Sequence, residues 1–402
     1  MAQSRNRVIY QSEALFGSKE YNSISKKDHT QLFRVQSANY GFTINRQDVN
    51  QYGNLARIDS LILEPPTVNF DISYYPTNGY NERALGFSVT NTSNPAEAQF
   101  SSGALAGGSG QNFYVLTVAD GFDANLDRAS GSTEHQIVGI GNAFLTDYTL
   151  DLSVGSLPTA TVSFEASNII SDTTVTGNDS LGVFGYSGIS SPAVEPVQGV
   201  PLSQTSSTFE NVKLPYATGN SWSGDNGVYL SDSQDKLSAL RPGDIGLDLT
   251  SFNGTALSTI GGTSGIHVQS ASLSLPLSRT PIERLGSKFP FARVVDFPVN
   301  ASLTVNAFVN TQTSQNLANL ISGCGGAGLK DVSISLKECG GTTDGLKITL
   351  KGCTIDSESF SSSIGSNKSV DLTFSTQIGG IRDLEKGVFF SGSNNTLLPW
   401  EY

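Results

Sequence analysis

The chain has 402 residues, of which 37% are hydrophobic and 42 are glycine. This length suggests two or three domains, and a composition dense in glycine, serine and threonine favours strands and turns over helices. The formal net charge of −12 excludes a strongly basic protein that grips nucleic acid by its phosphates.

Residues 1–30 are polar and of mixed composition, and we expect them to form an N-terminal arm. They contain no apolar run that would act as a secretory signal, and no stretch of the chain approaches the roughly 18 apolar residues of a membrane span. Cys324, Cys339 and Cys353 are an odd number of cysteines. These features are typical of a protein made in a reducing cytoplasm, with buried or idle thiols.

The first strand pattern, VQSANYGFTINRQDVNQYG at residues 35–53, has a counterpart in VQSASLSLPLSRTPIERLG at residues 268–286. Both segments begin with Val-Gln-Ser-Ala and run without a gap at an offset of 233 residues. An arginine and a glycine follow at matching positions, which are Arg46 and Gly53 in the first segment and Arg279 and Gly286 in the second. Self-similarity at a fixed offset indicates an internal repeat.

Apolar and polar residues alternate in these segments, which predicts strands with one apolar and one polar side. The apolar positions of the first strand and its counterpart are Tyr40, Phe42, Ile44 and Leu273, Leu275, Leu277. Those of the next strand and its counterpart are Val68, Phe70, Ile72 and Ala301, Leu303, Val305. Short helices at 81–87 and 314–322 would cover the apolar sides.

An acidic stretch, DANLDRASGSTE at residues 123–134, has the ligand spacing of a calcium loop. The candidate ligands are Asp123, Asn125, Asp127 and Glu134. Arg128 occupies the sixth position, where the sharp turn of a calcium loop needs glycine, and no amphipathic helix flanks the stretch. A solvated acidic loop is the favoured interpretation, and calcium is the weaker alternative.

A second pair of matching segments lies later in each copy. LDLSVGSLPTATVSFEAS at 150–167 resembles FSSSIGSNKSVDLTFSTQ at 360–377, at an offset of 210 residues. Residues 171–245 separate the copies and contain five prolines. A bare loop of this length is uncommon, so we expect a small β excursion or insertion there.

The polar sides of these strands contain no lysine or arginine. Ordinary solvated faces mix both charges, and a face without cations would let a polyanion pass because each cation–phosphate contact adds affinity. The expected positions are Asn39, Thr43, Asn45, Asn69, Asp71, Ser73, Thr159, Thr161, Ser163, Glu165, Ser272, Ser274, Ser278, Ser302, Thr304, Asn306, Asp371, Thr373, Ser375 and Gln377.

Arg46 and Arg279 begin the two repeated loops. Each could anchor its loop through an ion pair with Asp48 or Glu283, or it could contact another subunit, and the sequence leaves both interpretations open. Motifs for catalysis are missing: there is no nucleophile elbow, phosphate loop, zinc-protease histidine pair or Cys-x-x-Cys. We therefore expect neither an enzyme nor a bound cofactor.

The order of arm, strand, loop, strand, helix and hairpin resembles the tail tube proteins of long-tailed bacteriophages, over residues 30–170 and 246–385. In that family each domain gives four strands to the inner wall of a ring, and rings stack into a tube. Some members carry a duplicated domain and form trimers that imitate hexamers, and this chain resembles that kind.

The resemblance implies a mainly β fold, in which two tandem copies of an antiparallel β-sandwich or barrel domain, each with a short helix, contribute strands to a ring-shaped β-barrel. The expected segments are an arm at 1–30, copy 1 at 31–170, an insertion at 171–245, copy 2 at 246–390 and a C-terminal tail at 391–402. The loops 46–60 and 279–293 would bridge to the adjacent ring. The loop residues expected to make these contacts are Arg46, Asp48, Gly53, Arg279, Glu283 and Gly286.

Three such chains would supply about 24 strands and enclose a bore of roughly 35–40 Å, which accommodates a duplex about 20 Å wide. The implied partners are other copies of the chain, other tail proteins at the tube ends, and double-stranded DNA in transit without specific binding. The implied location is the virion, after assembly in a bacterial cytoplasm. The alternatives are another β-rich virion component (a tail terminator, baseplate or decoration protein) and, less favoured, a carbohydrate-binding adhesin.

Overall fold

The computed structural model describes residues 13–18, 30–63, 66–91, 110–118, 134–176, 217–218, 221–222, 240, 245–248, 266–283, 285, 292–309, 329–337, 344–361, 367, 369–380, 383 and 385–393. In these residues the protein is mainly β, and sixteen strands form one large sheet.

The elements follow in chain order. The first half contains β1 (Glu13–Ser18), β2 (Thr30–Gln31), β3 (Val35–Thr43), β4 (Arg46–Val49), β5 (Asp59–Ile62), β6 (Thr67–Tyr74), α1 (Tyr80–Ala84), β7 (Val89–Asn91), β8 (Gln111–Val118), β9 (Glu134–Ser153), β10 (Thr159–Ala166) and β11 (Asn168–Thr176). The second half contains β14 (Ile245–Asp248), β15 (Ile266–Pro276), β16 (Arg279–Ile282), β17 (Ala292–Val295), β18 (Asn300–Val309), β19 (Lys330–Lys337), β20 (Asp344–Ser361), β21 (Ser369–Gln377) and β22 (Gly387–Gly392). Between the halves, β12 (Ala217–Thr218) pairs with β13 (Ser221–Trp222).

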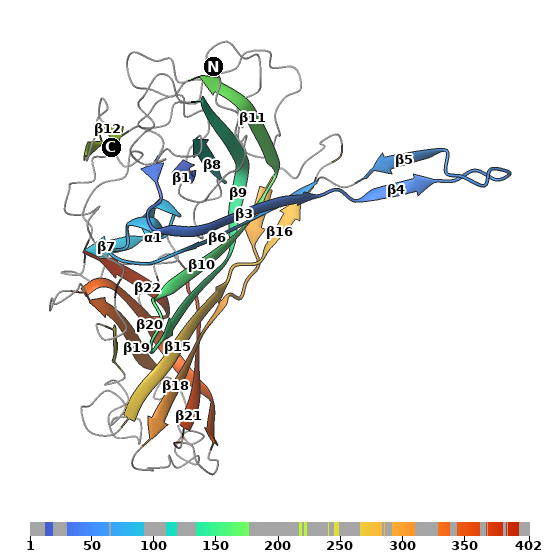
Figure 1. The fold of residues 1–402 in the computed structure, drawn as a ribbon. Coiled ribbons are helices and arrows are strands. Elements are labelled where there is room, and N and C mark those ends of the chain that lie inside the picture. The colour runs from blue at the N-terminus through green and yellow to red at the C-terminus, as the bar shows by residue number, and fades with distance from the viewer. Residues whose placement is uncertain are drawn as a thin grey trace.

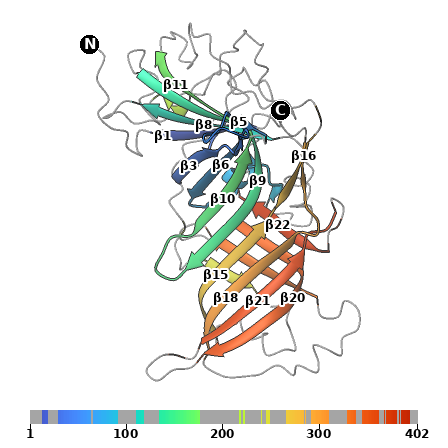
Figure 2. The ribbon, with the colours of Figure 1, turned by 90° about the vertical axis from the view of Figure 1, so that its right-hand side faces the viewer.

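Eight antiparallel strands form the centre of the sheet, in the order β20-β21-β18-β15-β9-β10-β6-β3 (Figures 1 and 2). The first half supplies β3, β6, β10 and β9, and the second half supplies β15, β18, β21 and β20. The two halves meet where β9 pairs with β15, from Ser153 opposite Ser270 to Asp147 opposite Pro276. We call this pairing the internal junction.

The central strands pair in the same register in both halves. Asn39 lies opposite Asp71, and the residues 233 positions later, Ser272 and Thr304, also lie opposite each other. The irregularities coincide as well, because the register shifts between Val35 and Ser37 and again between Val268 and Ser270. β9 and β20 each carry one extra residue at corresponding points, Thr146 and Asp356.

A second layer covers the apolar side of the central sheet. β9 and β20 are long enough to run from the central sheet into this layer, where β9 pairs with β8 and β11, and β20 pairs with β19 and β22. β1 pairs with β8 in the first half, and β14 pairs with β19 in the second half. The ring of Phe113 on β8 packs 5.1 Å from Phe70 on β6 and 4.7 Å from Phe164 on β10, measured between centroids.

One hydrophobic core extends through both halves. Phe87, which follows α1, stacks on Phe390 of β22 with ring centroids 5.2 Å apart and lies edge-on to Tyr148 of β9. β7 then pairs in parallel with β22. The segment after α1 in the first half therefore packs into the second layer of the second half, and it holds the two halves together.

The helix expected at 81–87 is present as α1, which is shorter than the segment suggested. Asn81 fixes it, because its side chain accepts from the amide of Phe33 and donates to the carbonyl of the same residue. The helix expected at 314–322 lies outside the described residues. Within the segment expected to be an arm, residues 13–18 form β1, which pairs with β8 along its whole length. β11 and β22 continue past the expected boundaries at 170 and 390.

Candidate functional site

The polar side of the central sheet forms a continuous surface, which we call the polar face. One row crosses all eight strands and consists only of serine and threonine. In order from β3 to β20, its members are Ser37, Ser73, Thr161, Thr149, Ser274, Ser302, Ser375 and Thr354. At one end of the row the hydroxyl oxygens of Ser37 and Ser73 lie 2.6 Å apart, and at the other end those of Ser375 and Thr354 lie 3.3 Å apart.

All twenty positions expected on the polar side are exposed or half-buried, whereas the apolar positions between them on β6, β10, β18 and β21 are buried. Asp147 and Asp151 of β9 join them at this face. The charged residues that these strands bring to the polar face are carboxylates, including Asp71, Asp151 and Asp371. Two of these carboxylates accept hydrogen bonds from uncharged side chains. The Ser272 hydroxyl donates to Asp151 over 2.6 Å, and the Asn306 amide donates to Asp371 over 2.5 Å.

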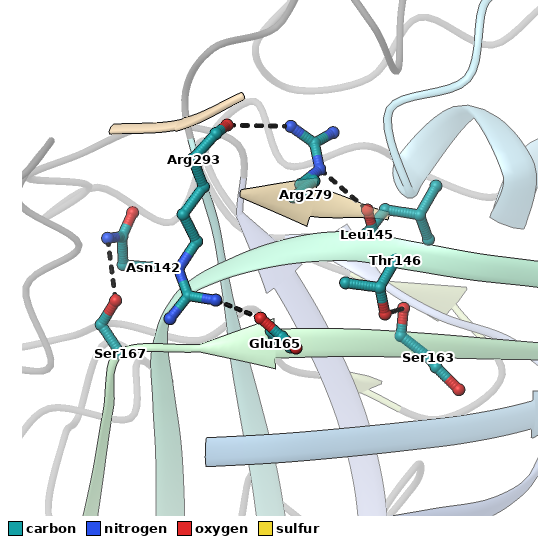
Figure 3. Close-up of polar contacts among 8 residues, drawn as sticks. All are labelled: Asn142, Leu145, Thr146, Ser163, Glu165, Ser167, Arg279 and Arg293. Carbon is teal, nitrogen blue, oxygen red and sulfur yellow. Dashed lines mark hydrogen bonds and ion pairs between the residues drawn. The ribbon is translucent and has the colours of Figure 1, made fainter. Parts of the chain in front are cut away.

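Glu165 differs from the other acidic residues of the polar face. The hairpin β16–β17 brings Arg293 to it, and the two side chains form an ion pair at the edge of the face (Figure 3). The Arg293 side chain is only 6% exposed, and that of Glu165 is 39% exposed. A cation that the eight central strands lack thus reaches the polar face from β17 of this hairpin, where it pairs with one of the carboxylates.

Arg279 fixes the same hairpin to the first half of the chain. Its Nε donates to the carbonyl oxygen of Leu145 over 2.9 Å, and its Nη1 donates to that of Arg293 over 3.3 Å (Figure 3). The guanidinium also lies 5.4 Å from the centroid of the Phe144 ring. Burial, with a smaller contribution from Arg293, lowers the pKa of Arg279 to about 10. The partners of this arginine are therefore two backbone carbonyls, one on β9 and one on β17, which the sequence did not indicate.

The hairpin β4–β5 has the same strand register as β16–β17 but extends away from the sheet (Figure 1). Arg46 at its base is exposed. Asp48, one of the candidate anchors, pairs with Arg57 of the same hairpin at 2.8 Å. Tyr52 and Leu55, near the turn with Gly53, are fully exposed. Glu283, just after β16, is exposed, and Gly286 lies outside the described residues.

The outer edges of the central sheet expose apolar side chains. Tyr40 and Phe42 of β3 are 43% and 62% exposed, and Phe360 of β20 is 40% exposed. Their counterparts at the internal junction, Leu273, Leu275 and Leu150, are completely buried. Within the described residues, β3 and the C-terminal part of β20 each pair with one neighbour, so both edges present unpaired backbone groups.

A buried carboxyl group lies beneath the internal junction. Glu82 of α1 accepts a hydrogen bond from the hydroxyl of Tyr74 over 2.9 Å, and burial raises its pKa to about 7. Burial and the nearby Glu82 also raise the pKa of Tyr148. The sequence placed Glu82 on a helix, but its burial depends on how α1 packs. The hydrogen-bond donor to its side chain is thus a tyrosine hydroxyl, and burial is the cause that raises its pKa.

The remaining candidates do not form a site in the described residues. Asp123, Asn125 and Asp127 of the possible calcium loop lie outside them, and Glu134 begins β9 with an undescribed side chain. No cluster of three metal-ligating side chains occurs in the described ranges. Cys353 is a buried free thiol, and burial is the main cause that raises its pKa to about 12.

No protein-family model matches the sequence, and comparison with curated proteins finds no relative. Among the residues that the structure describes, no helix is long and apolar enough to cross a membrane.

Proposed function

We propose that the chain is a structural virion protein, the tail tube protein of a long-tailed bacteriophage. In this proposal the chain is a tandem duplication, and three copies close into a ring of about 24 central strands. The rings stack into a tube, and double-stranded DNA passes through its bore. The central sheet would form the inner wall, with the polar face toward the DNA.

The observation that carries the proposal is the eight-stranded sheet with two matching halves and two unsatisfied edges. The halves pair internally in equal registers, down to the bulges. The outer edges expose Tyr40, Phe42 and Phe360, at positions that the internal junction buries. Exposed edges with apolar side chains favour association, and closure into a ring would remove both edges.

The chemistry of the polar face supports the passage of DNA. Hydroxyl groups and carboxylates offer no cation to phosphate, so a duplex would meet a surface to which it does not adhere. Arg293, an arginine that the described residues bring to this face, has a buried side chain and is paired with Glu165. The net charge of −12 agrees with a wall that repels rather than holds DNA.

Electron microscopy of the purified protein tests the proposal. Stacked rings with an open bore of roughly 35–40 Å and threefold symmetry are the expected result. Closed rings that never stack would favour a tail terminator or baseplate role. Monomers that persist at high concentration would contradict the proposal.

A further inference from the structure

The internal junction provides a template for contacts that the single chain does not make. At that junction, β15 of the second half pairs with β9 of the first half. β3 corresponds to β15 in register, and β20 corresponds to β9. The strands at the two outer edges are thus the counterparts of the two strands that pair inside the chain.

We infer that β3 of one chain pairs with β20 of a second chain in the register of the internal junction, and that the hairpin β4–β5 docks on the second chain as β16–β17 docks on β9. This inference rests on the proposed function, because it describes how copies of the chain join within a ring. It places the hairpin β4–β5 on a neighbour in the same ring, in place of the expected bridge from residues 46–60 to the adjacent ring. Its partner is a second copy of this chain.

The register follows residue by residue. Ser272 lies opposite Asp151 at the internal junction, so Asn39 would lie opposite Ser361 of the second chain. Likewise, Leu273 lies opposite Leu150 at the internal junction, so Tyr40 would lie opposite Phe360 of the second chain. The apolar residues exposed at the two edges would then cover each other, which is the arrangement expected of cross-strand apolar pairs.

The hairpin supplies the second contact. Arg279 donates to the carbonyl of Leu145, and the residue that corresponds to Leu145 on β20 is Ile355. Arg46, the counterpart of Arg279, would therefore donate to the carbonyl of Ile355 in the second chain. The ion pair between Arg293 and Glu165 would have no equivalent, because Ser60 and Ser375 stand at the corresponding positions.

An inter-chain disulfide tests the register. At one end of the internal junction the backbone amide of Leu277 donates to the carbonyl of Thr146, and at the other end the amide of Val154 donates to the carbonyl of Gln269. Both are therefore hydrogen-bonded pairs. Since hydrogen-bonded and non-hydrogen-bonded pairs alternate along an antiparallel ladder, Ser272 and Asp151 are a non-hydrogen-bonded pair, with Cα atoms about 4.5 Å apart. Asn39→Cys with Ser361→Cys would reproduce this geometry, which a disulfide spans.

The same two positions cannot join within one chain, because β3 and β20 are separated by seven strand spacings, or about 34 Å. Oxidation of the N39C/S361C variant should therefore give covalent dimers and trimers on a non-reducing gel. The variant N39C/S359C places the second cysteine two residues away, at the diagonal position. It should give about tenfold less crosslinked product than N39C/S361C, because the Cα atoms of the two cysteines would lie about 7–8 Å apart. The parent chain, with its own three cysteines, shows the background.

Arginine variants test the docking of the hairpin. R46A should lower the yield of the N39C/S361C crosslink about tenfold at limiting protein concentration, because a charge-assisted hydrogen bond is lost. R57A is the matched control, since Arg57 lies on the same hairpin but pairs with Asp48, and its yield should be unchanged. An equal loss in both variants would overturn the assigned contact of Arg46.

The outcomes separate this inference from the proposed function. Rings seen by electron microscopy together with a crosslink at 39–359 and none at 39–361 would overturn the register and leave the tube intact. Absence of any oligomer would overturn both.

Discussion

The internal junction and the outer edges contain corresponding strands in different environments. At the junction, Leu273 and Leu275 of β15 are buried against β9. At the edge, Tyr40 and Phe42 of β3 keep the same alternation but remain exposed. The register position of a residue therefore goes with its apolar character in both halves, whereas the presence of a neighbouring strand determines whether the residue is buried.

The two hairpins extend this comparison. β16–β17 is held to β9 by the hydrogen bond from Arg279 to the carbonyl of Leu145 and to β10 by the Arg293–Glu165 pair, while the second hydrogen bond of Arg279 lies within the hairpin. β4–β5 has the same register and an arginine at its base, but serines replace the ion pair at the corresponding positions. The contact within the chain is therefore stronger than the one that we propose between chains. A chain with this difference would fold first and assemble afterwards.

The largest expected effect comes from placing a charge at corresponding positions of the junction and the edge. Leu275→Asp should cost more than about 4 kcal/mol of unfolding free energy, because an unpaired carboxylate would lie in the core. Phe42→Asp should change that free energy by less than about 0.5 kcal/mol, because the side chain is exposed, yet it should abolish assembly. Urea denaturation and sedimentation velocity measure the two effects. An equal loss of unfolding free energy in both variants would contradict the different environments of the internal junction and the outer edge.

The buried Glu82 makes the stability of the junction depend on pH. Its folded-state pKa, about 7, is raised above the usual value of 4.5, so the folded state binds the proton more tightly than the unfolded state. Stability should therefore fall as pH rises from 4.5 to 7, by up to about 3 kcal/mol, and level off above that range. Glu82→Gln should remove this part of the pH dependence in denaturant melts. A variant with an unchanged pH profile would contradict the assignment.

The docking arginine should matter for folding only at the internal junction. Arg279→Ala should lower the unfolding free energy by about 2 kcal/mol, because the carbonyl of Leu145 loses its charged donor and Phe144 loses a cation contact. Arg46→Ala should leave the thermal midpoint of the single chain unchanged. Calorimetry at a concentration below assembly distinguishes the two, and a similar loss in both would show that the hairpins are not different.

The smallest effect is a gain between chains. Ser60→Arg with Ser375→Glu would copy the Arg293–Glu165 pair into the proposed contact. Partly exposed pairs are worth about 1 kcal/mol or less, so the concentration for half-assembly should fall about two- to fivefold. Neither single variant should do this, and light scattering across a dilution series measures it. A double variant that assembles no better than the parent would argue against this placement of the hairpin.

Much of the central sheet could be predicted from local patterns. Alternation in segments such as 67–73 and 300–306 identifies the strands and their polar sides because side chains on a strand alternate with a period of two. The offsets of 233 and 210 residues correspond to equal registers in the structure. The short helix expected at 81–87 is also present, as α1, although α1 ends earlier than expected.

Other features could not be predicted because they depend on contacts between distant segments. Residues 13–18 show no pattern that distinguishes a strand from an arm, and their pairing with β8 about a hundred residues later makes them β1. The partners of Arg279 are backbone carbonyls, which every residue carries, so no sequence motif identifies them. The burial of Glu82 likewise depends on the packing of α1 beside β6 and β9.

The alternation along each central strand identifies its apolar and its polar side from the amino-acid sequence alone, because the period of two is a local property of a strand. The sequence also determined that two segments share one pattern. The pairing of β9 with β15 is visible only in the tertiary structure, as is the position of β3 and the C-terminal part of β20 at the outer edges of the central sheet. Strand neighbours depend on packing between segments that are distant in the sequence, which no local pattern records.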